Sequence, residues 1–558
     1  MGRITDTKGH NGYLFWLLFC CVTFGLIYYL FPCRRYWGDD LYYALATESG
    51  DIKNTWISNP RHVLYGYLGF AVVYIFSSCA PHLRAVYLLQ GMNTLFGIAG
   101  IFVFGLTVYH VGKNRFVSLI LAASLASSYG YWNYAVRAES YALNNLVLIL
   151  VAYFLSKTDK GIANSRNSLA LGLALSCAIL TTVVNVLIVG TVVLSMLSAG
   201  YFRSSRKDSA ILVSAIILPV IAAYLVIARA ILKLGTVRGI IQWLFCGKQS
   251  RYFSFGADLP VKFLYGQFRT VIGGGFLNRW AVHGPDAAVL LCTLLSFLMV
   301  LFGLYLSYRM IKAGFWSILG RSGIAKIFML WLAAMSAFHF FWSTGDYKVL
   351  ISNLIPLYLL SAVILCHGDG RRIAAPFRKI VLVGIPVSLC AVNFFGDVLP
   401  QSNPRLNDDA NYTRFIIEHS APDDLVLISG SGESSVALQA EYFYGRHFLG
   451  LVVALRDPRG LADTIDVTLD NARGVYLTSD MKSISSNTFF KNIEQYKPEY
   501  AAEGGKVKAL LETFGFILKP SVRYNGKDRF QGQILYTIER KDESTAQNNQ
   551  GHRAPPPP

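Results

Sequence analysis

Charged residues are scarce in this chain of 558 residues: Asp, Glu, Lys and Arg make up 15% of it, whereas apolar residues make up 53%. A soluble domain carries about 25% charged residues. The deficit excludes a soluble enzyme and a disordered chain, because long apolar runs without charge cannot face water. The composition predicts a polytopic membrane protein that also has a water-soluble part.

Spaced cysteine motifs are absent as well. The nine Cys residues are scattered, none of them forms a Cys-x-x-Cys pair, and none lies in the C-terminal part of the chain. This pattern excludes a disulfide scaffold and gives no sign of a metal cluster.

Acidic residues are rare in the N-terminal part of the chain. Residues 1–396 hold 33 Lys and Arg but only 12 Asp and Glu, whereas residues 397–558 hold 18 and 21. The net charge of +18 therefore originates in the apolar part. Membrane topology or an anionic lipid substrate explains it better than nucleic acid does, so we expect no nucleic-acid partner.

Crossing about 30 Å of hydrocarbon takes roughly 20 apolar residues. Eleven runs approach this length and are predicted to be transmembrane helices: 13–31, 85–109, 116–131, 141–156, 168–184, 186–200, 209–228, 287–308, 326–342, 349–366 and 379–396. A signal peptide is the alternative for the first run, but no small-x-small cleavage site precedes Cys33, which favours an anchor.

A twelfth apolar run, 63–78, is assigned by the distribution of Lys and Arg. If it does not cross, the loops predicted to be cytoplasmic hold 18 basic residues, and the short outer loops hold only Arg137 and Lys348. If it crossed, this bias would invert, against the positive-inside rule. We therefore expect 63–78 to lie along the outer surface or to re-enter the membrane from it.

This topology defines three parts of the chain. Residues 1–396 form the transmembrane domain, with a cytoplasmic N-terminus and two long outer segments, 32–84 and 229–286. Residues 397–540 form a small extracytoplasmic α/β domain, in which strand-like runs alternate with helix-like stretches. Residues 541–558 are polar, end in four prolines and are predicted to be disordered.

The acidic residues indicate where chemistry could occur. Eight of the twelve in residues 1–396 fall on the outer side or at outer helix ends: Asp39, Asp40, Glu48, Asp51, Glu139, Asp258, Asp286 and Asp346. None lies in the middle of a predicted helix, where a proton relay or an ion-coupled transporter would usually need one.

Two adjacent carboxylates, Asp39 and Asp40, follow the first predicted helix among aromatic residues. A partly desolvated carboxylate at a membrane interface can take a proton from an incoming hydroxyl or amine. The alternative is structural, with Asp40 as the N-cap of an interfacial helix that starts at Leu41.

A second polar cluster, residues 131–145, lies at the outer junction of two predicted helices. It contains Arg137 and Glu139 among aromatic side chains. A polar hairpin with a weak surface ion pair is the structural alternative. The aromatic surroundings and the outer location favour a functional site.

These motifs carry a family resemblance. The pair Asp39-Asp40, followed by Tyr42-Tyr43-Ala44, resembles the Asp-Glu motif of the GT-C glycosyltransferases, which include protein O-mannosyltransferases and lipid A aminoarabinose transferases. Residues 59–65 lie where this group often has His-Pro-Pro-Leu-Tyr, although Arg61-His62 replaces His-Pro.

The second cluster resembles the same families. Residues 132–144 are similar to a stretch that reads roughly Trp, Ala, Ala-Glu-x-Tyr-x-Leu-Asn in the protein O-mannosyltransferase-like enzymes. The likeness covers residues 13–396 and is clearest in the first 150. It departs at Asp40, where the families have Glu.

The resemblance implies a GT-C fold and an inverting transfer of a sugar from a polyprenyl-phosphate donor, whose lipid tail lies between helices. The acceptor would be a protein, lipid or glycan outside a bacterial plasma membrane. Asp39 matches the catalytic carboxylate that deprotonates the acceptor. Asp40, Glu139 and His62 are expected to shape the acceptor site or to hold a divalent metal ion.

The donor phosphate needs positive groups. The candidates on the outer side are Arg61, Arg137, Arg269, Arg279 and Lys348. Some of the basic residues in 229–286 are equally explained as snorkelling side chains.

Two other functions stay open. A transporter or flippase of lipid-linked sugars would account for the apolar bulk and the basic loops, but it does not need the Asp pair. A non-catalytic assembly protein that binds through its C-terminal domain is the third.

Overall fold

The computed structural model describes residues 7–36, 38–158, 164–198, 205–245, 253, 255–277, 286–312, 322–367, 375–428, 435–450, 457–478, 511–526 and 531–541. The chain divides into two compact units. The first comprises Met1–Cys33 and Tyr43–Ser402, and the second comprises Arg34–Tyr42 and Asn403–Pro558. Arg279 and most of the C-terminal tail predicted to be disordered lie outside the described residues.

The first unit is a bundle of helices, as the hydropathy predicts. Each of the eleven apolar runs contains a helix: α1 (Thr7–Leu30), α4 (Ala85–Gly112), α5 (Arg115–Ser127), α7 (Tyr141–Thr158), α8 (Ser165–Thr181), α9 (Val186–Ser198), α11 (Arg206–Val226), α15 (Ala287–Lys312), α17 (Gly323–Phe341), α19 (Leu354–His367) and α20 (Ala375–Asn393). The predicted polytopic helical fold is confirmed.

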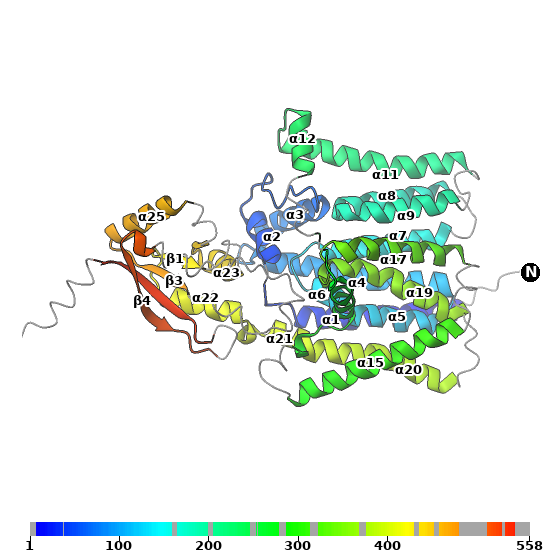
Figure 1. Cartoon of the computed structure of the whole chain (residues 1–558). Coiled ribbons are helices and arrows are strands. Elements are labelled where there is room, and N and C mark those ends of the chain that lie inside the picture. The colour runs from blue at the N-terminus through cyan, green and yellow to red at the C-terminus, as the bar shows by residue number, and fades with distance from the viewer. Residues whose placement is uncertain are drawn as a thin grey trace, which may run out of the picture. The chain divides into compact units, whose positions relative to one another are not determined.

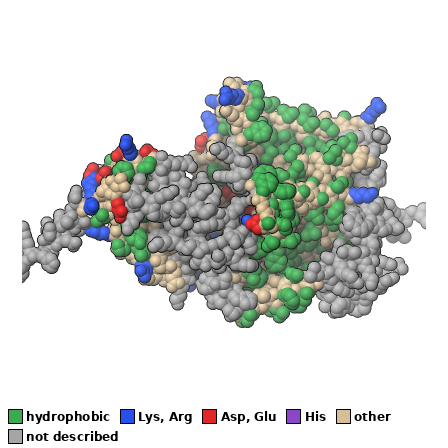
Figure 2. Space-filling model, in the orientation of Figure 1, with side chains coloured by type: hydrophobic (Ala, Val, Ile, Leu, Met, Phe, Trp, Pro, Cys, Tyr) green, Lys and Arg blue, Asp and Glu red, His purple; other side chains and the backbone are tan. Residues whose placement is uncertain are grey.

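Six described helical segments are long and apolar enough to cross a membrane. They leave large apolar side chains on the surface, such as Leu218 and Ile221 of α11. Figure 2 shows hydrophobic side chains covering the flank of the bundle. Such a surface suits contact with lipid.

Polar caps begin several of these helices. The side chains of Asn114, Asn164, Ser205 and Ser322 accept hydrogen bonds from first-turn N–H groups of α5, α8, α11 and α17. These caps satisfy backbone donors that a helix leaves unpaired at its start. All four lie in or beside loops predicted to be cytoplasmic.

Shorter helices connect the long ones: α3 (Val63–Cys79), α6 (Tyr129–Ala135), α12 (Val237–Leu244), α13 (Leu259–Val271) and α18 (Tyr347–Leu350). Of these, α3, α6 and α12 lie at one end of the bundle (Figure 1). The predicted outer segments 32–84 and 229–286, to which α3 and α12 belong, thus reach the same end. The side of the membrane that this end faces stays a prediction.

The second unit contains a five-stranded mixed sheet of order β2-β1-β3-β5-β4. Its strands are β1 (Leu425–Ile428), β2 (Phe448–Gly450), β3 (Val475–Thr478), β4 (Phe516–Arg523) and β5 (Ile534–Arg540), and its helices include α22 (Asp408–Glu418), α23 (Ser435–Tyr444) and α25 (Pro458–Asp470). β1 pairs in parallel with β2 and β3, and β5 pairs antiparallel with β3 and β4.

Alternation along β1 places core residues on both faces of this sheet. Val426 and Ile428 pack in one cluster with residues of α22 and α23, whereas Leu427 packs in another with residues of α25. The predicted small α/β domain is confirmed.

Candidate functional site

Five of the eight acidic residues predicted on the outer side have structural roles. The carboxylates of Glu48, Asp286 and Asp346 accept hydrogen bonds from first-turn N–H groups of α4, α15 and α18 at 2.7, 2.7 and 3.0 Å. Asp51 closes a turn by accepting from the N–H two residues later at 2.9 Å, and Asp258 lies 2.7 Å from the lysine one helical turn on. The acids left as candidates are Asp39, Asp40 and Glu139.

The helix is broken between α6 and α7, over residues 136–140. Two amide side chains of α4 replace the missing helical hydrogen bonds. Gln90 Nε2 donates to the backbone oxygens of Cys33 (2.7 Å) and Val136 (3.0 Å). Asn93 Nδ2 lies 2.6 and 2.7 Å from the backbone oxygens of Arg137 and Glu139. This break is therefore held by buried hydrogen bonds.

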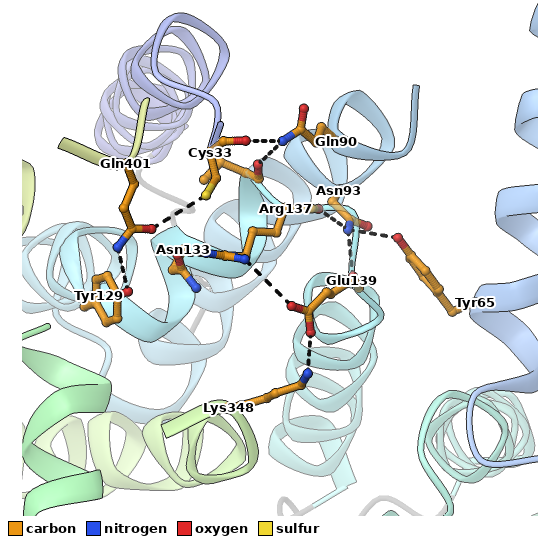
Figure 3. A network of polar contacts seen from close by, with 11 residues as sticks. Cys33, Tyr65, Gln90, Asn93, Tyr129, Asn133, Arg137, Glu139, Lys348 and Gln401 are labelled. Carbon is orange, nitrogen blue, oxygen red and sulfur yellow. Dashed lines mark hydrogen bonds and ion pairs between the residues drawn. The ribbon is translucent and has the colours of Figure 1, made fainter. Parts of the chain in front are cut away.

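A buried charge cluster occupies the break (Figure 3). The Arg137 and Glu139 side chains are 0% and 1% exposed, and that of Lys348 is 18% exposed. Glu139 Oε2 lies 2.8 Å from Lys348 Nζ, and Glu139 Oε1 lies 4.0 Å from Arg137 Nη1. Arg137 Nε also donates to Asn133 Oδ1 at 3.1 Å. The alternative of a weak surface ion pair is therefore wrong, because these charges are desolvated.

Aromatic rings surround this cluster. The ring of Tyr347 lies 5.3 Å from that of Tyr129 and 6.0 Å from that of Tyr134, measured between centroids. Arg269 of α13 lies over the Tyr347 ring, with Cζ 4.7 Å from its centroid. Lys348 Nζ lies 5.5 Å from the centroid of Tyr141. Two cationic side chains from distant parts of the sequence thus border one group of tyrosines.

His62 lies beside the same break. Its Nδ1 is 2.9 Å from the backbone oxygen of Thr181 and 3.2 Å from Ser140 Oγ, directly after Glu139 in the chain. Its ring centroid is 6.4 Å from that of Tyr141. The structure thus brings His62 close to the cluster, while Arg61 precedes it in the turn before α3.

Two buried hydrogen-bond donors next to the cluster have no hydrogen-bond partner among the described residues. They are the Tyr134 hydroxyl and Asn133 Nδ2. Burial raises the pKa of Tyr134 well above its ordinary value, so its hydroxyl stays protonated and can donate. Buried polar groups are normally paired, so water or a ligand is expected here.

Asp39 and Asp40 lie in the first turn of α2 (Gly38–Glu48). The N-cap prediction for Asp40 is therefore wrong, because the helix begins three residues before Leu41. Carboxylates in a first turn are stabilised by the helix dipole. Asp40 is buried (1% exposed) and Asp39 is partly exposed.

The segment Arg34–Tyr42, which carries this pair, is compact with the second unit. Tyr36 packs against Phe443 of α23, with ring centroids 5.4 Å apart. Asn407 Nδ2 donates to the backbone oxygen of Arg34 at 2.8 Å. These contacts tie the Asp-Asp segment to the C-terminal domain.

The described residues contain no group of three or more His, Cys, Asp or Glu side chains placed to hold a metal ion. The divalent metal ion expected from the sequence stays a prediction.

Sequence reasoning missed Gln90 and Asn93, and it assigned no role to Asn133 and Tyr134, although both lie in the predicted cluster 131–145. One signal could have found two of them, because Gln90 and Asn93 are amides inside an apolar run, spaced three residues apart on one helix face.

The sequence matches no protein-family model and no curated protein. The fold, however, has counterparts among solved structures. ArnT from Cupriavidus metallidurans in the apo state is similar with a TM-score of 0.57 and 10% identity, over 95% of this chain and 98% of that one.

The same protein bound to undecaprenyl phosphate gives a TM-score of 0.56 and 10% identity over 94% and 98% of the two chains. The apo oligosaccharyltransferase of Archaeoglobus fulgidus has a TM-score of 0.47 and 14% identity over 84% and 70%. The similarity to ArnT confirms the predicted GT-C-like fold.

Proposed function

We propose that this protein is an inverting glycosyltransferase that moves a sugar from a polyprenyl-phosphate donor to an acceptor on the extracytoplasmic face of a bacterial plasma membrane. The observation that carries the proposal is the buried Arg137–Glu139–Lys348 cluster in a chain that shares its fold with ArnT. One ArnT structure contains undecaprenyl phosphate. A polyprenyl phosphate is therefore the ligand class that this chain is proposed to bind.

The donor phosphate is proposed to bind beside Arg137, Lys348 and Arg269. Arginine and lysine form charge-assisted hydrogen bonds with phosphate oxygens, and these are strongest where water is excluded. The unsatisfied Tyr134 hydroxyl and Asn133 amide support the proposal, because both are donors. Arg61 and Arg279 are secondary candidates for the same phosphate.

Asp39 is proposed as the general base. It takes the proton from the acceptor hydroxyl or amine while the acceptor atom bonds to the anomeric carbon and the bond to the phosphate oxygen breaks. Polyprenyl phosphate leaves, and the cationic groups stabilise its developing charge. Asp40, Glu139 and His62 are proposed to shape the acceptor site.

Replacing the base tests this proposal. In membranes with matched expression of wild type and Asp39→Asn, lipid-linked sugars and glycosylated products are quantified by mass spectrometry. A positioned base typically contributes 10²–10⁴-fold, so transfer is expected to fall at least about 100-fold. The lipid-linked sugar should co-purify with the variant, which would identify the donor.

The matched control is Asp51→Asn, which changes a carboxylate of the same outer segment that only closes a turn. Its transfer should equal that of wild type. Unchanged transfer by Asp39→Asn would contradict the enzymatic proposal and favour a transporter or flippase.

A further inference from the structure

Three polar side chains lie four residues apart where the first unit ends: Asn393, Asp397 and Gln401. They span the end of α20, the π-helix η6 (Phe394–Val398) and α21 (Leu399–Ser402). Asn393 and Asp397 are 0% and 4% exposed. π-Helical turns inside helices often mark functional positions.

Asn393 and Asp397 hold the loop Gly273–Gly275. The first N–H of the loop donates to Asn393 Oδ1 at 3.0 Å. The second and third donate to the two carboxylate oxygens of Asp397 at 3.1 and 2.9 Å. Three successive backbone donors are thus satisfied by two side chains. Hydrogen bonds to a buried carboxylate are among the stronger ones, because the acceptor is charged.

The loop can approach the carboxylate only because it has no side chains. A Cβ on Gly275 would lie 2.5 Å from Asp397 Oδ1 and 2.8 Å from the backbone oxygen of Gly396, and a Cβ on Gly273 would also collide with the carboxylate. Gly274 has φ +131°, which other residues rarely adopt. Gly273 and Gly275 are therefore required because a Cβ would have no space, and Gly274 is required because of its positive φ.

The same loop directly follows the helix that carries Arg269. α13 ends at Val271, two residues before the loop, and a Cβ built on Gly274 would lie 3.8 Å from Arg269 Cγ and 4.0 Å from its Nε. A side chain at position 274 would therefore contact the stem of Arg269, whose guanidinium lies over Tyr347.

Gln401 binds a tyrosine that packs on Tyr347. Its Nε2 donates to the Tyr129 hydroxyl at 2.9 Å, and the Tyr129 ring packs on Tyr347. Figure 3 shows Gln401 between Tyr129 and Cys33. The segment 393–401 thus binds both the loop that follows α13 and Tyr129.

We propose that Asp397, assisted by Asn393, is a positioning residue that holds the triglycine loop and thereby fixes Arg269 for binding the phosphate of a polyprenyl-phosphate ligand. The inference rests on the proposed function. In this role Asp397 acts through the loop. Loss of the Asp397 carboxylate should weaken phosphate binding, because Arg269 is then no longer held in position.

A double-mutant cycle on the full-length protein in nanodiscs tests this role, with undecaprenyl phosphate as the probe and its dissociation constant as the readout. Arg269→Ala should weaken binding about tenfold or more, since a hydrogen bond to a charged group contributes about 1.5–3 kcal/mol. Asp397→Asn should weaken it several-fold, because an amide cannot accept from both glycine N–H groups. The double variant should bind no more weakly than Arg269→Ala alone.

Gly275→Ala is an independent probe, because it keeps both Asp397 and Arg269 and separates the loop from the Asp397 carboxylate by a steric clash. It should weaken binding like Asp397→Asn. The matched control is Gly384→Ala in α20, where a Cβ meets no atom within 4 Å and binding should be unchanged. Melting temperatures measured without ligand separate lost folding from lost binding.

The outcomes separate the two proposals. If Arg269→Ala weakens binding but Asp397→Asn and Gly275→Ala do not, or if the two single effects add in the double variant, the positioning role is wrong. If Arg269→Ala leaves binding unchanged, the phosphate role of Arg269 in the proposed function fails.

Discussion

At the scale of single residues, the environment of Glu139 distinguishes it from the other outer acids. Its carboxylate is almost fully buried between Arg137 and Lys348. Capping carboxylates such as Glu48 and Asp286 have a purely structural explanation, whereas Glu139 compensates cations that the proposed donor phosphate would also meet. Charge, rather than shape, is therefore the property of Glu139 to test.

Glu139→Gln keeps the shape of the side chain and removes its charge. It should destabilise the ligand-free protein by roughly 2–3 kcal/mol, less than for a fully buried pair, because Lys348 is partly exposed. Undecaprenyl phosphate should then raise the melting temperature of the variant more than that of wild type, since its phosphate replaces the missing anion.

Asp258→Asn is the control for this variant, because it removes an exposed ion pair with Lys262 and should leave the melting temperature unchanged. An equal effect of undecaprenyl phosphate on wild type and Glu139→Gln would show that the phosphate does not bind near Glu139.

At the scale of elements, α4 determines the conformation of the break between α6 and α7. The sequence of Val136–Ser140 does not by itself determine where the helix is interrupted. Gln90 and Asn93 determine it, because they donate hydrogen bonds to carbonyl groups that a continuous helix would pair internally.

Asn93→Leu removes the donor shared by the backbone oxygens of Arg137 and Glu139 while keeping α4 apolar and helical. Two buried carbonyls lose their partner, so we expect a destabilisation of about 2 kcal/mol or more and at least tenfold weaker binding of undecaprenyl phosphate. Thermal unfolding and ligand titration of the purified protein measure the two effects.

Gly91→Ala, on the same helix, is the control, because a Cβ there meets no atom within 4 Å. Binding by Asn93→Leu that matched the control would mean that the break forms without α4.

At the scale of the whole molecule, the distribution of Lys and Arg predicts which end of the bundle faces outward. This distribution also predicts that α3 (Val63–Cys79) does not cross the membrane. Reporter fusions after residue 84 and after residue 113 should therefore report outside and inside, respectively. The reverse pair of results would show that α3 crosses the membrane and would invert every later loop.

The apolar runs alone determined the architecture of the first unit. Each run of suitable length is a helix, because backbone groups in lipid must be paired within the segment. In the second unit, the strand-like runs 425–428 and 474–477 and the helix-like stretch 409–419 predict β1, β3 and α22 close to their observed bounds. The aromatic residues around Arg137 and Glu139, together with their predicted outer location, identified both as candidate site residues.

Only the tertiary structure decided which residues share a site. Arg137 and Lys348 share the carboxylate of Glu139, and Arg269 lies over Tyr347, because the segments that carry them pack together in the fold, which no local pattern encodes. Asp397 was not predicted as a site residue, because it directly follows the last apolar run and its charge suggested that it belongs to the soluble domain. Its role depends on a loop more than a hundred residues away, and such long-range pairing is a property of the folded chain rather than of any segment of it.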